Sequence, residues 1–520
     1  MAGGVLGGGS GGIYSVGMRR LLPGLVVVLA LIHFTLFFVN GRVAAMLDPV
    51  DPDAANFADV ARNIVRGRGI VQSAGGGTEG RFIQELAPLP SPLTAQPPLY
   101  PLAIAGLSLL GVPIPDAAVA LAVAAYACVA AVGGAIAGRL YGSFAGVITA
   151  LALVAYRPLT FWSVLMMSDV PGLALVLLQY WFLISGRFGL AGLAGGLSVA
   201  TRFAAAPFLG VGLLYVLRTQ PRGALRYVIL GAVPVAAVLG RNVFLIGRLT
   251  PVLNPTGQDV PSDIIEAART LALSYAPLPH RVGPLVLVST ILVVGLIMIR
   301  RGTVRETMLK SGRWLLPTSA LAYFAFILAM RWRWAVDPMN TRMMLPVGAI
   351  MVIVLVGWVA SVLPPIPAKW TAGVAAAALA VLVSLEAEAT FHRPQASWST
   401  YAARSAQLQW IIANTTEDDL IITQGGTFTA FYADRPSVIN LSSAPHNIPL
   451  TSAALMTYVR RYGAAYRRIL LVVRQNTTET YYGPFLASLA AGAGFPGIRR
   501  EAEMPGAYAF RLTAFPEAAR

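Results

Sequence analysis

The chain has 520 residues, of which 56% are hydrophobic and 12% are charged, whereas an ordinary soluble domain carries about 25% charged residues. Its mean hydropathy is +0.67. The formal charge of +16 comes mostly from arginines in short segments between apolar runs, where basic residues hold cytoplasmic loops in place. The composition excludes an ordinary soluble protein and indicates a polytopic α-helical protein of the lipid bilayer, with no nucleic-acid partner.

Several kinds of chemistry are also excluded. Lysine occurs only at Lys310 and Lys369, and neither lies in the G-x-x-x-x-G-K context of a P-loop ATPase. Cys128 is the only cysteine, so neither an intramolecular disulfide nor a cysteine metal cluster is expected. The four histidines form no H-x-x-x-H ligand pair. We expect no required cofactor; a divalent metal is compatible with the sequence, but no motif supports one.

The arginines orient the apolar runs. Arg19 and Arg20 precede the first run, near 22–40, and place residues 1–20 in the cytoplasm as a flexible tail. Residues 21–389 then form a transmembrane domain of about 11 to 13 helices, with 99–112 treated as interfacial or re-entrant. The later spans are expected near 117–137, 143–158, 169–185, 190–201, 203–217, 227–247, 285–299, 314–330, 342–362 and 370–388.

Two parts of the chain are expected outside the cytoplasm. The first is a loop at 41–97, and the second is residues 390–520, where the composition becomes mixed. A helical stretch near 401–414 and strand-like runs at 420–423 and 469–473 predict a small α/β domain there.

The first external loop gathers acidic residues. It holds six of the 23 acids in the chain. Within it, residues 53–68 carry apolar side chains at helical spacing, which predicts a short amphipathic helix with Asp53 at its amino-terminal cap. Asp53 has two interpretations, a cap alone or a reactive carboxylate. The run QPPLYP at 96–101 is a rigid segment that would hold the end of the loop against the membrane, because proline fixes φ.

Two further ionisable residues lie at the edges of apolar runs. Asp169 stands in SDVPG at the outer start of a span, and Arg202 stands in GLSVATRFAAAP between two apolar halves. Ionisable groups at such positions are costly in lipid and are functional candidates. The alternatives are that Ser168 and Asp169 form an N-cap and that Arg202 snorkels to the interface.

These segments, in this order, resemble the dolichyl-phosphate-mannose protein mannosyltransferase superfamily, and in particular its bacterial branch, which includes lipid A aminoarabinose transferases. The resemblance covers roughly residues 20 to 440. It implies a GT-C fold with a small extracytoplasmic α/β domain. The matching segments are DAANFADVARNIV, QPPLYP, SDVPG, GGLSVATRFAAAP, NTRMMLPV, QWIIANTTEDDLI and YADRP.

The resemblance implies a multi-pass enzyme of the inner (plasma) membrane, a hexosyl- or pentosyltransferase with its site on the extracytoplasmic side. It would move a sugar from a polyprenyl-phosphate donor to a glycan, lipid or protein acceptor, with inversion. Asp53 would be the general base, and arginines would bind the donor phosphate, since guanidinium suits phosphate. The candidates for binding the donor phosphate are Arg202 and Arg342, with Arg331 and Arg333 in reserve. The supporting acids would be Asp169, Glu79 and Glu85. The loop motif would consist of Gln96, Pro97, Pro98 and Tyr100.

The sequence also departs from the family pattern. The family's Asp-Glu pair is Asp53-Ala54 here, and the residues before PPLY lack the acid and lysine of the aminoarabinose branch. These departures argue against aminoarabinose as the sugar. Three other functions stay open: a secondary transporter, which would want charges near the bilayer midplane; a polysaccharide polymerase or ligase that uses polyprenyl-linked sugars; and a scaffold without enzyme activity.

Overall fold

The part of the chain that the structure describes includes most of the predicted spans and strands. The runs near 22–40, 285–299 and 370–388, together with Glu79 and Glu85, lie outside it. The computed structural model describes residues 52–75, 89–165, 167–250, 259–275, 312–333, 339–362, 405–423, 426–439, 459–460, 463–474, 488–489, 494–495, 497–505 and 507–513.

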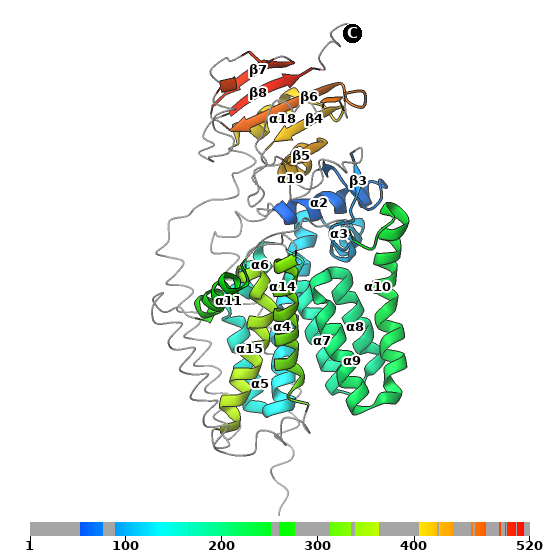
Figure 1. Cartoon of the computed structure of the whole chain (residues 1–520), viewed down its shortest axis with the longest axis vertical. Helices are drawn as coiled ribbons and strands as arrows, with labels where there is room; N and C mark the ends of the chain where they lie inside the picture. The colour runs from blue at the N-terminus through cyan, green and yellow to red at the C-terminus, as the bar shows by residue number, and fades with distance from the viewer. Residues whose placement is uncertain are drawn as a thin grey trace, which may run out of the picture.

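The lower part of the molecule is a helical bundle (Figure 1). Four of its helices among the described residues are long and apolar enough to cross a membrane, or five if one bent pair counts as a single span. The chain is therefore a multi-pass membrane protein. The four helices are α4 (Ile114–Tyr141), α10 (Ala224–Ile246, preceded by η3, Pro221–Gly223), α14 (Leu315–Arg333) and α15 (Thr341–Val362).

Shorter apolar helices complete the bundle. One of them, α3 (Leu99–Leu109), rises roughly 17 Å at about 1.5 Å per residue, about half of a ~30 Å hydrocarbon core. It is too short to cross, which agrees with the interfacial or re-entrant interpretation. The others are α7 (Asp169–Ile184), α8 (Phe188–Thr201) and η2 (Phe203–Ala205) with α9 (Ala206–Thr219). The less apolar helix α11 (Val260–Tyr275) packs against α14 and α15.

The predicted spans that fall on described residues coincide with helices to within a few residues, with one exception. The span predicted near 143–158 is bent rather than straight. Helix α5 (Ser143–Val154) is followed by α6 (Arg157–Val164) at a bend of 53°. Pro158 lies in the first turn of α6. Proline fits a first turn, but it lacks the N–H that would bond the Val154 carbonyl in a continued helix, and its ring would clash with that carbonyl, so the chain restarts a helix here.

Close backbone approaches bring the bundle helices together. Gly192 and Gly196 on α8 lie against the backbone of Tyr227 and Gly231 on α10, where a Cβ atom would collide with the carbonyl groups. Small residues of this kind let membrane helices approach closely. The buried amide of Gln179 on α7 also donates a 2.9 Å hydrogen bond to the Tyr227 hydroxyl. These contacts join α7, α8 and α10 into one rigid group.

Helix α2 (Pro52–Val65) lies between the bundle and the sheet (Figure 1). The predicted helix at 53–68 is therefore confirmed, although it begins one residue earlier, so that Asp53 lies in its first turn rather than at the cap. Its alanines are buried, and Phe57 meets Tyr100 of α3 edge to face at 5.3 Å. The apolar face of α2 thus packs on the end of the bundle.

The first loop is also anchored from the side. Its strand β1 (Val71–Gln72) pairs antiparallel with β3 (Ser91–Pro92). Arg241 of α10 donates hydrogen bonds to the Leu93 and Ile70 carbonyls at 2.6 and 2.9 Å. The loop is therefore bound to a membrane helix through its own backbone.

The upper part of the molecule is a six-stranded sheet, ordered β2-β5-β4-β6-β8-β7 (Figure 1). Strands β2, β5, β4 and β6 run parallel, and β8 and β7 continue antiparallel. The predicted strands at 420–423 and 469–473 and the helix near 401–414 are confirmed. The elements are β4 (Asp419–Thr423), β5 (Ser437–Ile439), β6 (Arg468–Arg474), β7 (Ile498–Met504), β8 (Ala507–Leu512), α18 (Ala406–Asn414), α19 (Gly426–Phe428) and η5 (Thr429–Ala433).

The sheet includes a strand from the first loop, which the sequence did not indicate. Strand β2 (Ala74–Gly75) pairs in parallel with β5, with Ala74 opposite Ser437. The Ser437 amide donates to the Ser73 carbonyl at 3.1 Å. The six-stranded sheet is therefore assembled from two segments that lie more than 300 residues apart in the chain. We call this sheet, with the helices packed on it, the external domain after its predicted location.

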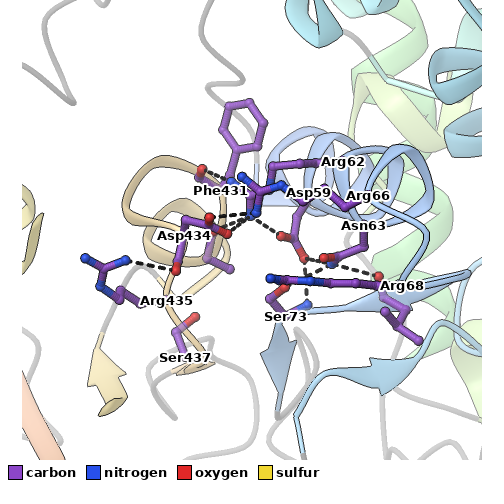
Figure 2. Close-up of polar contacts among 12 residues, drawn as sticks. Asp59, Arg62, Asn63, Arg66, Arg68, Ser73, Phe431, Asp434, Arg435 and Ser437 are labelled. Atoms are coloured by element: carbon purple, nitrogen blue, oxygen red, sulfur yellow. Dashed lines mark hydrogen bonds and ion pairs between the residues drawn. The ribbon is translucent and has the colours of Figure 1, made fainter. Parts of the chain in front are cut away.

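A network of polar contacts joins α2 to η5, and we call it the loop–domain seam (Figure 2). It centres on Arg62, whose guanidinium contacts Asp59 at 2.6 Å and Asp434 at 3.1 Å. The same guanidinium donates to the Phe431 and Ala430 carbonyls at 2.6 and 2.7 Å. Arg62 thus connects the helix that carries Asp53 with the external domain.

Asp59 is fully buried within the loop–domain seam. Burial raises the pKa of Asp59, while the Arg62 charge and hydrogen bonds from Ser73 favour the carboxylate. The Ser73 amide donates to Asp59 at 2.6 Å, and Asn63 donates to it at 3.4 Å and to the Ser73 hydroxyl at 2.9 Å (Figure 2). Asp59 therefore orders the turn that leads from α2 into β2.

We expect Arg62→Met to destabilise the protein by about 3 kcal/mol, because it leaves the buried Asp59 carboxylate without its cation. Thermal unfolding in detergent measures this loss. Arg68→Met is the matched control, because the Arg68 side chain is 43% exposed and its partner Glu417 is 70% exposed at 3.5 Å. Such a surface pair contributes at most about 1 kcal/mol. Equal losses in the two variants would contradict the assigned role of Arg62.

A second buried carboxylate lies at the start of β4. Burial by itself would raise the pKa of Asp419, but hydrogen bonds from Arg468, Thr416 and Arg467 together hold it well below its usual value of 3.8. Arg468 contacts this carboxylate at 2.7 Å and Arg467 at 3.2 Å. The ionised form of Asp419 therefore stabilises the folded external domain.

The external domain should lose stability in acid through Asp419. Because the folded pKa lies below the unfolded one, the stabilisation is present above about pH 4 and disappears as the pH falls toward the folded pKa. We expect the thermal midpoint of the protein to fall between pH 5 and 3, and Asp419→Asn to flatten that fall. Asp418→Asn, at the exposed neighbouring position, should leave the pH dependence of the thermal midpoint unchanged. The same pH dependence in wild type and Asp419→Asn would contradict the role assigned to Asp419.

Candidate active site

Four charged side chains form a chain of ion pairs beneath α2. The guanidinium of Arg342 contacts Asp53 at 2.6 Å and Asp169 at 3.2 Å. Asp169 also forms an ion pair with Arg202. These side chains are between 3% and 17% exposed. The sequence singled out all four, and the structure brings them together into one group with no net formal charge.

The positions of these residues follow from the helix directions. Asp169 opens α7, and Arg202 follows the last residue of α8. Helices that follow one another through a short turn run antiparallel, so the start of α7 and the end of α8 lie at the same end of the bundle. Arg342 is the second residue of α15, whose start lies there too. Three helix ends therefore meet under α2.

Asp53 faces this group from the first turn of α2. Its second oxygen accepts a 3.0 Å hydrogen bond from the Gln96 amide. Gln96 begins the QPPLYP run, in which Pro97, Pro98 and Tyr100 are buried. The rigid run therefore holds an amide donor against the carboxylate, which places the predicted loop motif next to the predicted base.

Gly172 and Tyr323 also border the group. Gly172 lies one turn after Asp169, and a Cβ atom there would meet the Arg202 side chain at 3.4 Å. Tyr323 of α14 is buried and lies within electrostatic range of Arg202, Asp169 and Arg342. Gly172 is the last residue of the SDVPG segment, whereas Tyr323, an aromatic residue in an apolar helix, carried no signal in the sequence.

Arg331 and Arg333, the reserve candidates for the donor phosphate, do not belong to the group of four charges. Arg331 is buried, and its guanidinium contacts the buried Asp263 carboxylate of α11 through hydrogen bonds of 2.6 and 2.9 Å. This bidentate pair fastens α11 to α14. Arg333 is exposed at the end of α14. Of the proposed supporting acids, Asp169 is in the group of four, whereas Glu79 and Glu85 fall outside the described residues.

The donor set does not fit a metal ion. In the part of the chain that the structure describes, no three side chains of His, Cys, Asp or Glu converge on one point. Asp53 and Asp169 are also separated by the Arg342 guanidinium that contacts both.

Three amide side chains form a hydrogen-bonded group that reaches Asp53 through Gln96. Asn56 lies one turn after Asp53 and donates to the Gln96 and Gln72 side-chain oxygens at 3.2 and 3.3 Å. The i, i+3 spacing of Asp53 and Asn56 on the predicted helix is the signal that could have identified Asn56. No sequence signal could have identified Gln72, because it lies in a strand of only two residues.

Comparison with known proteins rests on structure. No family model matches the chain, and no curated protein sequence matches it. The chain is similar to the crystal structure of ArnT from Cupriavidus metallidurans bound to undecaprenyl phosphate, with a TM-score of 0.56 and 15% identity over 95% of this chain and 99% of that one. The crystal structure of the same protein in the apo state has a TM-score of 0.55 and 15% identity, with the same coverage of both chains.

The chain has a GT-C fold. A third solved structure, the Archaeoglobus fulgidus oligosaccharyltransferase in complex with Zn and sulfate, has a TM-score of 0.41 and 12% identity, covering 94% of this chain and 74% of that one. The similarity to the two ArnT structures confirms the predicted fold class of the GT-C type, and the sheet of the structure confirms the small α/β region at the carboxyl end. In this GT-C chain, the group of four charges lies where the bundle meets the first loop.

The ion pairs should be interdependent. We expect Asp169→Asn to cost about 3 kcal/mol of stability, because it leaves two partly buried guanidiniums without their shared carboxylate. The double variant Asp169→Asn/Arg202→Met should lose less stability than the sum of the losses in the two single variants. Thermal unfolding of the wild type, the two single variants and the double variant in detergent measures this double-mutant cycle. Asp116→Asn, at the exposed start of α4, is the control. Strict additivity would show that Asp169 and Arg202 do not interact.

Proposed function

We propose that the protein is a membrane glycosyltransferase that transfers a sugar from a polyprenyl-phosphate donor to an extracytoplasmic acceptor, with inversion of the anomeric centre. The observation that carries the proposal is the contact of Arg342 with both Asp53 and Asp169, beside Arg202 and under α2. It puts a carboxylate and two guanidiniums within one ionic group. The similarity in fold to a protein solved with undecaprenyl phosphate supports this choice of donor.

Arg202 and Arg342 would bind the donor phosphate. As the sugar–oxygen bond breaks, the phosphate leaves with the bonding electrons and gains negative charge, which guanidinium N–H groups stabilise through charge-assisted hydrogen bonds. The ion pair of Arg202 with Asp169 uses one of its terminal nitrogens. With respect to the described residues, its other N–H groups remain for a phosphate. Asp169 would hold both arginines in place before the donor arrives.

Asp53 would act as the general base. The acceptor hydroxyl oxygen forms a bond to the anomeric carbon, the carbon–oxygen bond to phosphate breaks on the opposite face, and the hydroxyl proton passes to Asp53. This single displacement inverts the anomeric centre. The hydrogen bond from Gln96 and the ion pair with Arg342 orient the carboxylate.

The site would lie on the extracytoplasmic side of the inner membrane. The arginine distribution supports this orientation, because Arg19 and Arg20 and the basic segments between spans favour the cytoplasmic side. The external sheet would then stand above the site, joined to α2 by β2 and by the loop–domain seam. It would hold α2 in place and form one wall of the acceptor path.

We expect Asp53→Asn to lower sugar transfer by at least about 100-fold, since a positioned base contributes roughly 10² to 10⁴. Transfer of radiolabelled sugar from a panel of polyprenyl-phosphate monosaccharides, in membranes with equal amounts of each variant, measures this. Asp418→Asn changes an exposed acid of the external domain and should leave transfer unchanged.

Each other outcome has a definite meaning. Equal transfer in wild type and Asp53→Asn would assign the base to another residue. Absence of transfer from every donor in wild type would overturn the proposed reaction and favour a transporter or a polymerase with a diphosphate donor.

A further inference from the structure

A small cluster of amide side chains lies against the proposed base, and the proposed chemistry has not used it. Asn56, Gln72 and Gln96 come from α2, β1 and the segment before α3. Asn56 donates to the side-chain oxygens of both glutamines, and Gln96 donates to Asp53. Three segments of the first loop therefore bring neutral amides into one hydrogen-bonded cluster, which contacts Asp53 through Gln96.

The cluster leaves hydrogen-bonding groups unused. The side-chain oxygen of Asn56 is shielded from solvent and accepts no hydrogen bond from the described residues. The Gln72 amide nitrogen donates to none of the described residues, since its side-chain contact is the bond that its oxygen accepts from Asn56. Gln96 uses one of its two N–H groups on Asp53. Donors and an acceptor thus remain side by side.

This combination suits hydroxyl groups rather than phosphate. A hydroxyl both donates and accepts hydrogen bonds, so it can satisfy an amide oxygen and an amide N–H at the same time. A phosphate oxygen only accepts, and charged guanidiniums bind it more strongly. A buried amide oxygen without a donor is unfavourable, and a bound hydroxyl would relieve that cost.

We propose that Asn56, Gln72 and Gln96 form a subsite for sugar hydroxyls, next to the phosphate-binding arginines. The inference rests on the proposed function, because it takes Asp53 as the reacting carboxylate. Gln72 would donate to one hydroxyl, and the Asn56 oxygen would accept from the same or an adjacent one. The subsite positions the sugar against Asp53, while Arg202 and Arg342 hold the charged part of the donor.

Binding to the full-length protein in detergent tests this subsite with three probes. They are undecaprenyl phosphate, undecaprenyl phosphate carrying one hexose (glucose, mannose or galactose), and the octyl glycosides of the same hexoses. We expect Gln72→Met to weaken binding of the hexose-bearing lipid by roughly three- to tenfold, the effect of one or two neutral hydrogen bonds. Binding of undecaprenyl phosphate should not change.

Two further variants keep the test specific. Gln72→Glu retains an oxygen for the Asn56 amide but removes the N–H donors, so it should also weaken hexose binding even if Gln72→Met alters the loop. Gln220→Met makes the same chemical change at an exposed position after α9 and should alter no affinity. Thermal midpoints show whether each variant is folded.

The outcomes separate the subsite from the proposed function. Loss confined to the hexose-bearing lipid assigns the subsite to the donor sugar, and loss confined to the octyl glycosides assigns it to a carbohydrate acceptor. Unchanged affinities for both kinds of hexose in folded Gln72 variants overturn the subsite. If wild type binds neither lipid, the polyprenyl donor is wrong, and the octyl glycosides alone decide whether the amides bind hydroxyls.

Discussion

Mutual neutralisation of four poorly solvated charges is the constraint on which the rest of the site depends. A carboxylate or guanidinium removed from water is stable only with a partner at close range. Asp169 would be such an uncompensated charge at the start of α7 without Arg202 and Arg342. The same pairing requires the ends of α7, α8 and α15 to meet, and Asp53 completes it from α2. The charges that the chemistry would use are therefore also the contacts that fix the first loop on the bundle.

The first loop and the external domain behave as one structural unit. Strand β2 supplies an edge of the sheet, and Arg62 reaches from α2 to the end of η5. A displacement of the sheet would therefore act on α2 and on the orientation of Asp53. This coupling explains why a short amphipathic helix, which buries one face on the bundle, can hold a carboxylate in a defined position. Its other face is held by the loop–domain seam.

Sequence reasoning succeeded where a physical signal was local. The long apolar runs of the bundle, the short apolar runs of β4 and β6 and the helical spacing of α2 are such signals, and so is the presence of Asp169 and Arg202 at the edges of apolar runs. It failed where the determining contact was distant or weakly encoded. Asp434 is more than 300 residues from Arg62, and β2 has only two residues. The break between α5 and α6 depended on one proline, and the same run could be read as a continuous span.

The arrangement of charged and neutral groups around Asp53 gives the site two regions of different chemistry. On one side, Arg342 and Arg202 offer fixed positive charge, which suits a group that becomes more negative during the reaction. On the other side, Gln96, Asn56 and Gln72 offer hydrogen bonds without charge. Because Asp53 contacts Arg342 through one oxygen and Gln96 through the other, it lies at the boundary between them. A glycosyl phosphate has the same division, a charged phosphate joined to a neutral ring, and the bond that breaks lies at that junction.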